Sequence, residues 1–290
     1  MITNERVVDA ERIRSTFRRL TPERHPVLSR CTRDVVYDEG RCMAPGGLVL
    51  ADAVGRHLDL QPGQSVLDLG CGRGQSSIYL AARYDVSVTS VDLWITADER
   101  RRAATAAGLA QRITPWQGDI RRGLPPETPL FDAIVCVQAF HTFGTSTAMV
   151  RYLATLLEPG GALCIAQGCF SDECESIPEP FCDSDGWQAD YARYHSAPWW
   201  RAHIDASGVF KVEACAEFED GDVMWEDDVL YRGDRAGWSA DYLSRAGWLM
   251  QHIRHGQTHH PRLTHLLLKA VRKTPGETAS GASSVTGVPR

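Results

Sequence analysis

The sequence predicts an α/β fold with a doubly wound, mostly parallel sheet, and three observations support this prediction. Short apolar segments alternate with segments of helical periodicity from residue 65 to residue 167, which is typical of parallel strands joined by crossover helices. A glycine-rich turn follows the first apolar segment and opens a predicted helix. Acidic residues stand at the carboxyl ends of predicted strands, which is the edge of such a sheet where ligands bind.

The predicted elements follow one another in a regular order. Residues 1–58 form an N-terminal extension, with one predicted helix over Asp9–Leu20 and a second over about Leu48–Leu58. The main domain is predicted over 59–272. Its first part is, in order, strand 65–69, helix 75–83, strand 86–91, helix 97–107, strand 113–117, strand 132–137, helix 145–156 and strand 162–167.

The composition changes after residue 167. Residues 168–207 are rich in aromatic and acidic side chains and too long for a simple connection, so we expect a functional lid there. An insertion is predicted over 219–262, and the Gly/Ser/Thr/Pro-rich tail 273–290 is predicted to be disordered. The remaining elements are predicted to be helix Pro198–Ala206, strand Val209–Phe218, helix Trp238–His255 and a last, antiparallel strand Leu263–Val271.

The most informative motif is the loop after the first strand. Gly70, Gly72 and Gly74 stand at alternate positions, and glycine is needed where the backbone takes positive φ or closely approaches a ligand. The spacing is G-x-G-x-G, unlike the G-x-G-x-x-G of dinucleotide sites, which opposes an oxidoreductase. Asp68 would repel a pyrophosphate but attract an ammonium group. The motif therefore predicts a ligand with a cation and an adenosine, although such a loop alone is as often a plain turn.

With these residues in place, the chain resembles the class I S-adenosylmethionine (SAM)-dependent methyltransferases over roughly residues 43–272. Five segments carry the resemblance in the family's order: the glycine loop, Val86–Asp92, Ile113–Ile120, Phe131–Val137 and Leu157–Leu163. The resemblance implies a seven-stranded Rossmann-like sheet and SAM as cofactor. It also implies cofactor contacts by Asp68, Gly70, Cys71, Gly72, Gly74, Asp92, Leu93, Trp94, Gly118, Asp119, Ile120 and Gln138.

Two of these acids have specific roles in the family. By the resemblance, Asp92 accepts both ribose hydroxyls of the adenosine, and Asp119 meets the adenine amino group. Read without the resemblance, Asp92 is equally suited to cap the helix that follows it.

A closer resemblance links the chain to bacterial small-molecule methyltransferases that are labelled loosely after cyclopropane fatty acid synthases. The similar segments are Asp92–Ile95, Ala139–Thr145, His195–His203 and Ala206–Val209. The N-terminal extension and the long stretch 219–245 suggest a specialised acceptor pocket, as in enzymes that tailor secondary metabolites.

His141 is the candidate catalytic residue, since it follows the fourth strand, whose end lies beside the methyl group in this fold. Its imidazole suits a general base, and a pocket wall is the alternative interpretation. Four aromatic residues are candidates for acceptor binding with His141, and core packing is the alternative for each. They are Tyr194, Trp199, Trp200 and Trp225.

The run Glu217–Asp228 holds seven acids in twelve residues. It reads as a solvated loop or, if it faces the cleft, as a site that attracts a cationic acceptor such as an amine. The short basic cluster Arg100–Arg102 reads as a solvated helix face.

Composition narrows the function further. The net charge of −6 and pI of about 5.9 disfavour a nucleic-acid groove. Nine cysteines without a CxxC pair, and no signal peptide, indicate a reducing cytoplasm. No apolar run reaches membrane-spanning length. Neither the cysteines Cys169, Cys174 and Cys182 nor the pair His259-His260 fits a common zinc pattern, so no metal is expected.

The sequence thus predicts a cytoplasmic SAM-dependent methyltransferase of a small-molecule acceptor, with an amine slightly favoured by the acidic run. O- or C-methylation of a phenol or enol is the nearest alternative, and a non-catalytic SAM-binding protein is the second. A homodimer is a possible assembly.

Overall fold

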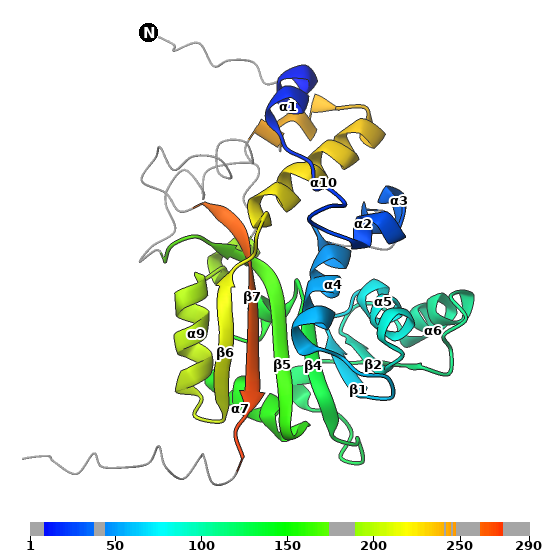
Figure 1. Cartoon of the computed structure of the whole chain (residues 1–290), viewed down its shortest axis with the longest axis vertical. Helices are drawn as coiled ribbons and strands as arrows, with labels where there is room; N and C mark the ends of the chain where they lie inside the picture. The colour runs from blue at the N-terminus through cyan, green and yellow to red at the C-terminus, as the bar shows by residue number, and fades with distance from the viewer. Residues whose placement is uncertain are drawn as a thin grey trace, which may run out of the picture.

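The centre of the computed structural model is a seven-stranded sheet with the order β3-β2-β1-β4-β5-β7-β6 (Figure 1). The structure describes residues 9–37, 44–173, 189–240, 242–244, 246–247 and 262–274. Neighbours among β1 to β5 pair in parallel, and β7 runs antiparallel to both β5 and β6. The predicted fold class and the antiparallel last strand are therefore confirmed.

The strands lie close to their predicted positions. They are β1 Ser65–Leu69, β2 Ser87–Asp92, β3 Ile113–Gln117, β4 Phe131–Val137, β5 Leu157–Phe170, β6 Phe210–Glu217 and β7 Leu263–Arg272. β5 is longer than the predicted strand 162–167, because its pairing with β7 continues to Phe170, opposite Leu263.

The described helices are α1 Ala10–Thr16, α2 Val27–Arg30, α3 Arg33–Tyr37, α4 Gly47–Leu58, α5 Gln75–Tyr84, α6 Ala97–Ala106, α7 Thr147–Thr155, α9 Ala197–Ala206 and α10 Gly221–Ala236. Three short 3-10 helices, η1 Ile120–Arg122, η2 Phe140–Thr142 and η3 Ala189–Arg193, lie between them. α9 begins where the sequence predicts, because the Ser196 hydroxyl accepts a hydrogen bond from the Trp199 backbone N–H.

Alternation along β4 divides the core between the two faces of the sheet. Ala133 and Val135 pack in a cluster with α4 and α5, whereas Ile134 and Cys136 pack in a second cluster with α7 and α9. Successive side chains of a strand point to opposite faces, so a sheet covered on both sides is apolar throughout. Figure 1 shows α9 and α4 on opposite sides of the sheet.

The N-terminal helices lie against α10 at the end of the sheet where the parallel strands finish (Figure 1). From the sequence, the run Glu217–Asp228 reads as a solvated loop, but Gly221–Ala236 forms helix α10, and Val223, Trp225 and Leu230 on it are buried. A third apolar cluster joins α1, α10, Tyr191 and Phe170. The acidic run is therefore part of a packed helix and not a solvated loop.

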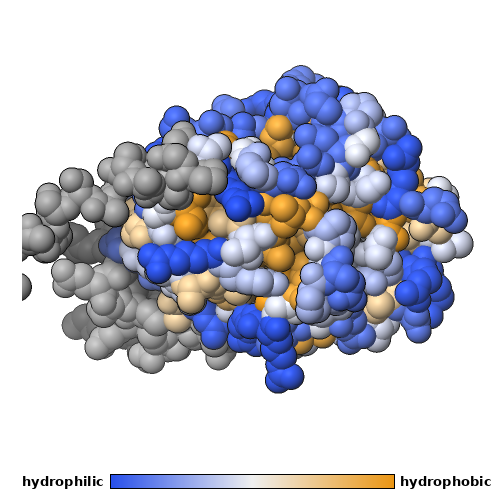
Figure 2. Space-filling view, turned by 90° about the horizontal axis from the view of Figure 1, so that it is seen from below, coloured by the Kyte–Doolittle hydropathy of each residue, from blue (hydrophilic) through white to orange (hydrophobic). Residues whose placement is uncertain are grey.

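Figure 2 shows the molecule from below, at the end of the sheet opposite α10, where hydrophobic residues gather in a central area with hydrophilic residues around it. In the described part of the chain, no helix combines the length and apolar character that crossing a membrane requires. The possible homodimer stays a prediction.

Candidate active site

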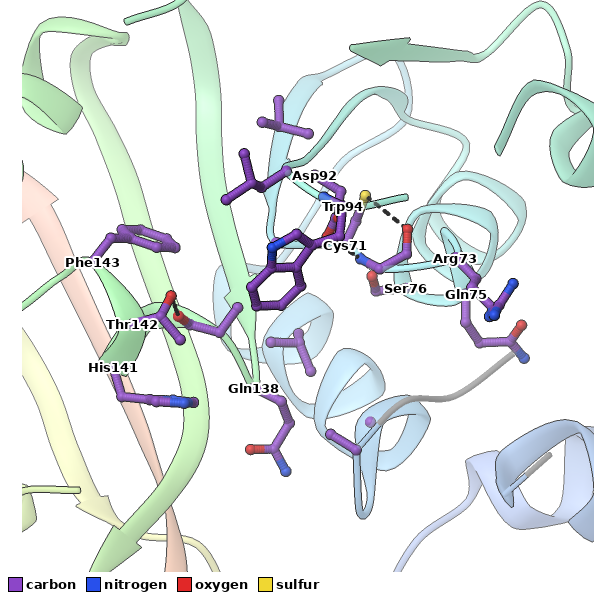
Figure 3. A pocket seen from close by; sticks show the side chains of 18 of the residues that line it. Cys71, Arg73, Gln75, Ser76, Asp92, Trp94, Gln138, His141, Thr142 and Phe143 are labelled. Atoms are coloured by element: carbon purple, nitrogen blue, oxygen red, sulfur yellow. Dashed lines mark hydrogen bonds between the residues drawn. The ribbon is translucent and has the colours of Figure 1, made fainter. Parts of the chain in front are cut away.

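A cavity of about 790 Å³ opens at the carboxyl ends of the parallel strands, within the range of roughly 300–1,000 Å³ usual for small-molecule sites. One end is lined by the glycine loop and by the residues that follow β2 and β3. The η2 turn after β4 lies away from the glycine loop, as the positions of His141 and Cys71 in Figure 3 show. Arg193, Tyr194 and residues of α10 also line the cavity. The switch point of the sheet therefore holds a two-ended pocket, as the strand-end acids predict.

The glycine loop needs glycine for two separate reasons. Gly70 and Gly72 have φ values of +67° and +54°, which side chains disfavour. A Cβ atom on Gly70 would also lie 2.3 Å from the Cβ of Ala139. Both glycines and Cys71 line the cavity, whereas Gly74 caps the start of α5 in the left-handed conformation and is not among the lining residues.

Asp92 joins the loop to the end of β2. One carboxylate oxygen accepts a hydrogen bond from the Gly72 N–H at 2.9 Å. The other accepts from the backbone N–H groups of Trp94 and Ile95 at 2.8 and 2.9 Å. The next helix starts at Ala97 with Thr96 as its cap, so the interpretation of Asp92 as that cap is wrong.

Asp68 lies beneath the loop and is not among the cavity-lining residues, in contrast to its expected contact with a ligand. Its Oδ2 accepts hydrogen bonds from the Ser76 and Ser77 hydroxyls, both at 2.6 Å, so it fixes the first turn of α5. Burial raises the pKa of this carboxyl group. Its Oδ1 is buried and has no hydrogen-bond donor among the described residues.

Arg100 lies beneath the glycine loop and supports it together with β2 and β3. The sequence predicts this residue to be solvated, and that prediction is wrong. Only 1% of the residue is exposed. Its guanidinium donates to the Ser90 carbonyl at 2.6 Å and to the Trp116 carbonyl at 3.0 Å, and so joins β2 to β3. The sequence does not indicate that Arg100 is buried, because it stands in a run of three arginines and the other two, Arg101 and Arg102, are exposed.

The end of the cavity beside β3 carries the other predicted cofactor residues. Gly118, Asp119 and Ile120 line it, together with Leu93 and Trp94. The Asp119 carboxylate bonds the Arg121 guanidinium at 2.8 Å, which lowers the pKa of the carboxyl group. Trp94 is 71% exposed, and Figure 3 shows its ring between Asp92 and Gln138.

Three of the candidate acceptor residues, His141, Tyr194 and Trp225, line the cavity away from the glycine loop. The backbone N–H of His141 donates to the Gln167 side chain at 2.8 Å, which fixes the η2 turn. The imidazole meets the edge of the Tyr194 ring at a centroid distance of 4.8 Å. Thr142 and Phe143 also line this end, although the sequence did not single them out.

Trp199 and Trp200, in contrast, do not line the cavity. Trp199 is stacked between His195 and His203, at centroid distances of 3.6 and 4.8 Å. Trp200 is buried against Phe140 in the core cluster of α7 and α9. Their predicted role in acceptor binding is therefore wrong, and both hold α9 against the sheet.

Gln138 lines the cavity, but other protein groups engage its amide. It has a φ of +62°, which is strained for a residue other than glycine. Its Nε2 donates to the Pro45 carbonyl at 2.6 Å and to His265 Nε2 at 2.7 Å. Its Oε1 accepts from the Gly168 N–H at 2.9 Å. It therefore joins β4 to the loop before α4, to β5 and to β7.

His265 completes this network, and nothing in the sequence pattern of its strand marks it. Its Nδ1 donates to the Gly221 carbonyl at 2.6 Å, so its Nε2 accepts from Gln138. Complete burial lowers the pKa of His265 to about 4. The imidazole is therefore neutral near pH 7 and connects β7 to the start of α10.

The acidic run turns most of its charge away from the cavity. The Glu226 carboxylate takes two hydrogen bonds of 3.0 Å from the Arg18 guanidinium. Asp227 bonds the Arg33 guanidinium and the Tyr37 hydroxyl. Of the run's acids, Asp228 alone lines the cavity, and it pairs with Arg232. The run therefore anchors the N-terminal extension, and this support for a cationic acceptor is removed.

Among the described residues, no group of His, Cys, Asp and Glu side chains is arranged to hold a metal ion. The predictions that concern Cys174, Cys182, His259 and His260 lie outside the described residues.

Comparison with known proteins agrees with the fold and the loop. Residues 66–161 match a family model described as a methyltransferase domain. The chain is 31% identical over 141 residues to phosphoethanolamine N-methyltransferase 3 of Arabidopsis thaliana, covering 49% of this chain and 28% of the relative. It is 29% identical over 129 residues to the 27-O-demethylrifamycin SV methyltransferase of Amycolatopsis mediterranei, covering 44% of this chain and 47% of the relative.

A solved structure supports the same fold. The SAM-dependent methyltransferase of Thiobacillus denitrificans, in complex with S-adenosyl-L-homocysteine, aligns with a TM-score of 0.58 and 19% identity over 83% of this chain and 97% of that one. The matched part of this chain spans less than half of the length of each of the two curated relatives, the Arabidopsis and Amycolatopsis enzymes. The fold is that of the solved methyltransferases it aligns with, and residues 66–161, which include the glycine loop, are similar to a methyltransferase domain.

Proposed function

We propose that the chain is a SAM-dependent methyltransferase that acts on a small molecule held at the His141 end of the cavity. One observation carries the proposal: a single cavity joins the glycine loop and Asp92 to His141, Tyr194 and Trp225. An arrangement of this kind holds a donor and an acceptor side by side, which is the main contribution of an enzyme to a displacement reaction.

The residues at the loop end suit SAM. The positive φ of Gly70 and Gly72 brings bare backbone to the cavity wall. An ionised carboxylate has about four lone-pair sites, of which Asp92 uses three for backbone N–H groups, so it can accept from a ribose hydroxyl. The exposed Trp94 ring offers a flat face on which the adenine ring of SAM can stack. When bound, SAM supplies a methyl group on a sulfonium centre.

His141 is proposed to take the proton from the acceptor. The η2 turn holds it at the cavity, where Tyr194 limits the positions of its ring. Imidazole is the side chain that most often moves a proton near neutral pH. The acceptor atom is a nitrogen or an oxygen, in keeping with curated relatives named as an N-methyltransferase and an O-methyltransferase.

The test is transfer of a labelled methyl group from SAM to a panel of amines and phenols. Methylation of at least one acceptor, lost in Gly70→Val, is the expected outcome. If SAM binds tightly and no acceptor of either class consumes it, the non-catalytic SAM-binding function replaces this proposal.

A further inference from the structure

We propose that Gln167, a residue of β5 outside the cavity, positions His141 for the transfer reaction; the inference rests on the proposed function. The backbone N–H of His141 donates to Gln167 Oε1 at 2.8 Å, and both residues are buried. His141 lines the cavity, whereas Gln167 is not among the lining residues. Gln167 therefore acts on the reaction through His141 and not through a contact with either substrate.

Gln167 is a polar residue in an apolar stripe of β5. Its neighbours on the same face of the strand, Ile165 and Cys169, pack in the cluster of α7 and α9, and Leu266 stands opposite it on β7. Gln167 itself is completely buried. Burial of an amide costs stability unless its polar atoms are hydrogen-bonded, so packing alone favours an apolar side chain here. The bond to His141 explains why a glutamine occupies this position.

The η2 turn requires an acceptor at this place. Its own backbone hydrogen bonds begin at Thr142, whose N–H donates to the Ala139 carbonyl at 3.0 Å. The first N–H groups of a helix precede this pattern and have no acceptor within it. The His141 N–H is one of them, and the Gln167 oxygen supplies an acceptor for it. The bond thus holds the turn at the residue that carries the imidazole.

The Gln167 oxygen is itself held in place, because Gln138 bonds β5 on both sides of it. The Gln138 backbone N–H donates to the Ala166 carbonyl at 2.8 Å, and the Gly168 N–H donates to Gln138 Oε1 at 2.9 Å. Figure 3 shows the ring of His141 pointing from the η2 turn towards Gln138. A shift of about 1 Å in a reacting group can cost roughly 100-fold in rate, so this support favours transfer.

The first test is amide hydrogen exchange by NMR, which requires no acceptor molecule. Gln167→Leu removes the hydrogen-bond acceptor, so the His141 amide should exchange roughly 5- to 10-fold faster. The Val150 amide of α7, which donates to the Ser146 carbonyl, should keep its rate. Cys169→Ala is the matched control, because Cys169 is buried on the same face of β5, and it should leave the His141 amide unchanged. An unchanged His141 amide in Gln167→Leu would overturn the inference.

The second test is steady-state kinetics with a methylated acceptor. In Gln167→Leu, kcat should fall roughly 10- to 100-fold, while the acceptor KM and the Kd of S-adenosylhomocysteine stay near the wild-type values. Gln167→Glu should keep most of the rate at pH 7. Burial keeps its carboxyl group protonated, its carbonyl oxygen still accepts, and the Nε2 that it replaces has no hydrogen-bond partner among the described residues.

A double-mutant cycle tests whether Gln167 acts through His141. Added to His141→Ala, the change Gln167→Leu should lower kcat no further. A further fall, an equal loss in Cys169→Ala, or no recovery in Gln167→Glu would overturn the inference.

Failure of the proposed function gives a different pattern. If His141→Ala has the kcat of the wild type, the proposed role of His141 in proton transfer is wrong, although faster exchange of its amide in Gln167→Leu would still assign Gln167 to the η2 turn. If His141→Ala loses its rate but Gln167→Leu keeps both the wild-type rate and the wild-type exchange, the proposed function stands and the role of Gln167 is refuted.

Discussion

The His265 network makes the most quantitative prediction. His265 is neutral in the folded protein, where its pKa is lowered to about 4 from 6.5. The unfolded chain therefore binds a proton between these values while the folded protein does not, so stability falls as the pH drops from 6.5 towards 4. This lowered pKa corresponds to about 3 kcal/mol of stability in total, of which about 2 kcal/mol is lost by pH 5.

The assay is urea unfolding of the wild type and of His265→Gln at several pH values between 7.5 and 5. The variant lacks the buried titrating group, so its stability should change about 2 kcal/mol less over this range. His203→Gln is the matched control, since burial also lowers the pKa of His203, but this residue is half-buried on α9. Parallel pH profiles for the wild type and His265→Gln would refute the neutral, buried imidazole and with it the Gln138 connection.

Three further variants address the site and its support. Asp92→Ala removes both the expected ribose acceptor and the tether of Gly72, so calorimetry should show SAM binding weaker by about 2–3 kcal/mol; unchanged affinity would limit Asp92 to a structural role. His141→Ala should lower kcat roughly 10²–10⁴-fold with SAM affinity nearly unchanged; an effect on acceptor KM alone, rescued by His141→Gln, would make it a pocket wall. Asp227→Asn removes the buried charge that the Arg33 guanidinium and the Tyr37 hydroxyl bond, and because Arg33 itself is 38% exposed, the free energy of unfolding should fall by only about 1–2 kcal/mol; a neutral result in urea unfolding would show that this pair does not anchor the N-terminal extension.

The local pattern of apolar segments, each followed by an acid or by glycines, was enough to predict the part of the site that lies at the strand ends. Asp92 follows an apolar segment and precedes a helix, and the parallel sheet then brings it to the glycine loop without further information. The position of His141 after β4 follows from the same alternation.

The features that the sequence did not predict depend on contacts between residues far apart in the chain. The acids of α10 read as a solvated loop because their partners, Arg18 and Arg33, lie about two hundred positions earlier. Arg100 has the same composition around it as the exposed Arg101, and burial alone distinguishes them. Trp199 and Trp200 show that an aromatic-rich segment does not reveal which face of the sheet it will cover.

The central claim is that the cavity at the glycine loop binds SAM, and the most direct measurement is calorimetric titration with S-adenosylhomocysteine. The account predicts saturable one-site binding to the wild type and none to Gly70→Val, whose added side chain meets Ala139, with the circular dichroism spectrum retained. The wild-type chain should give no heat with NAD. Binding of NAD in place of S-adenosylhomocysteine, or equal binding by a folded Gly70→Val variant, would contradict the account.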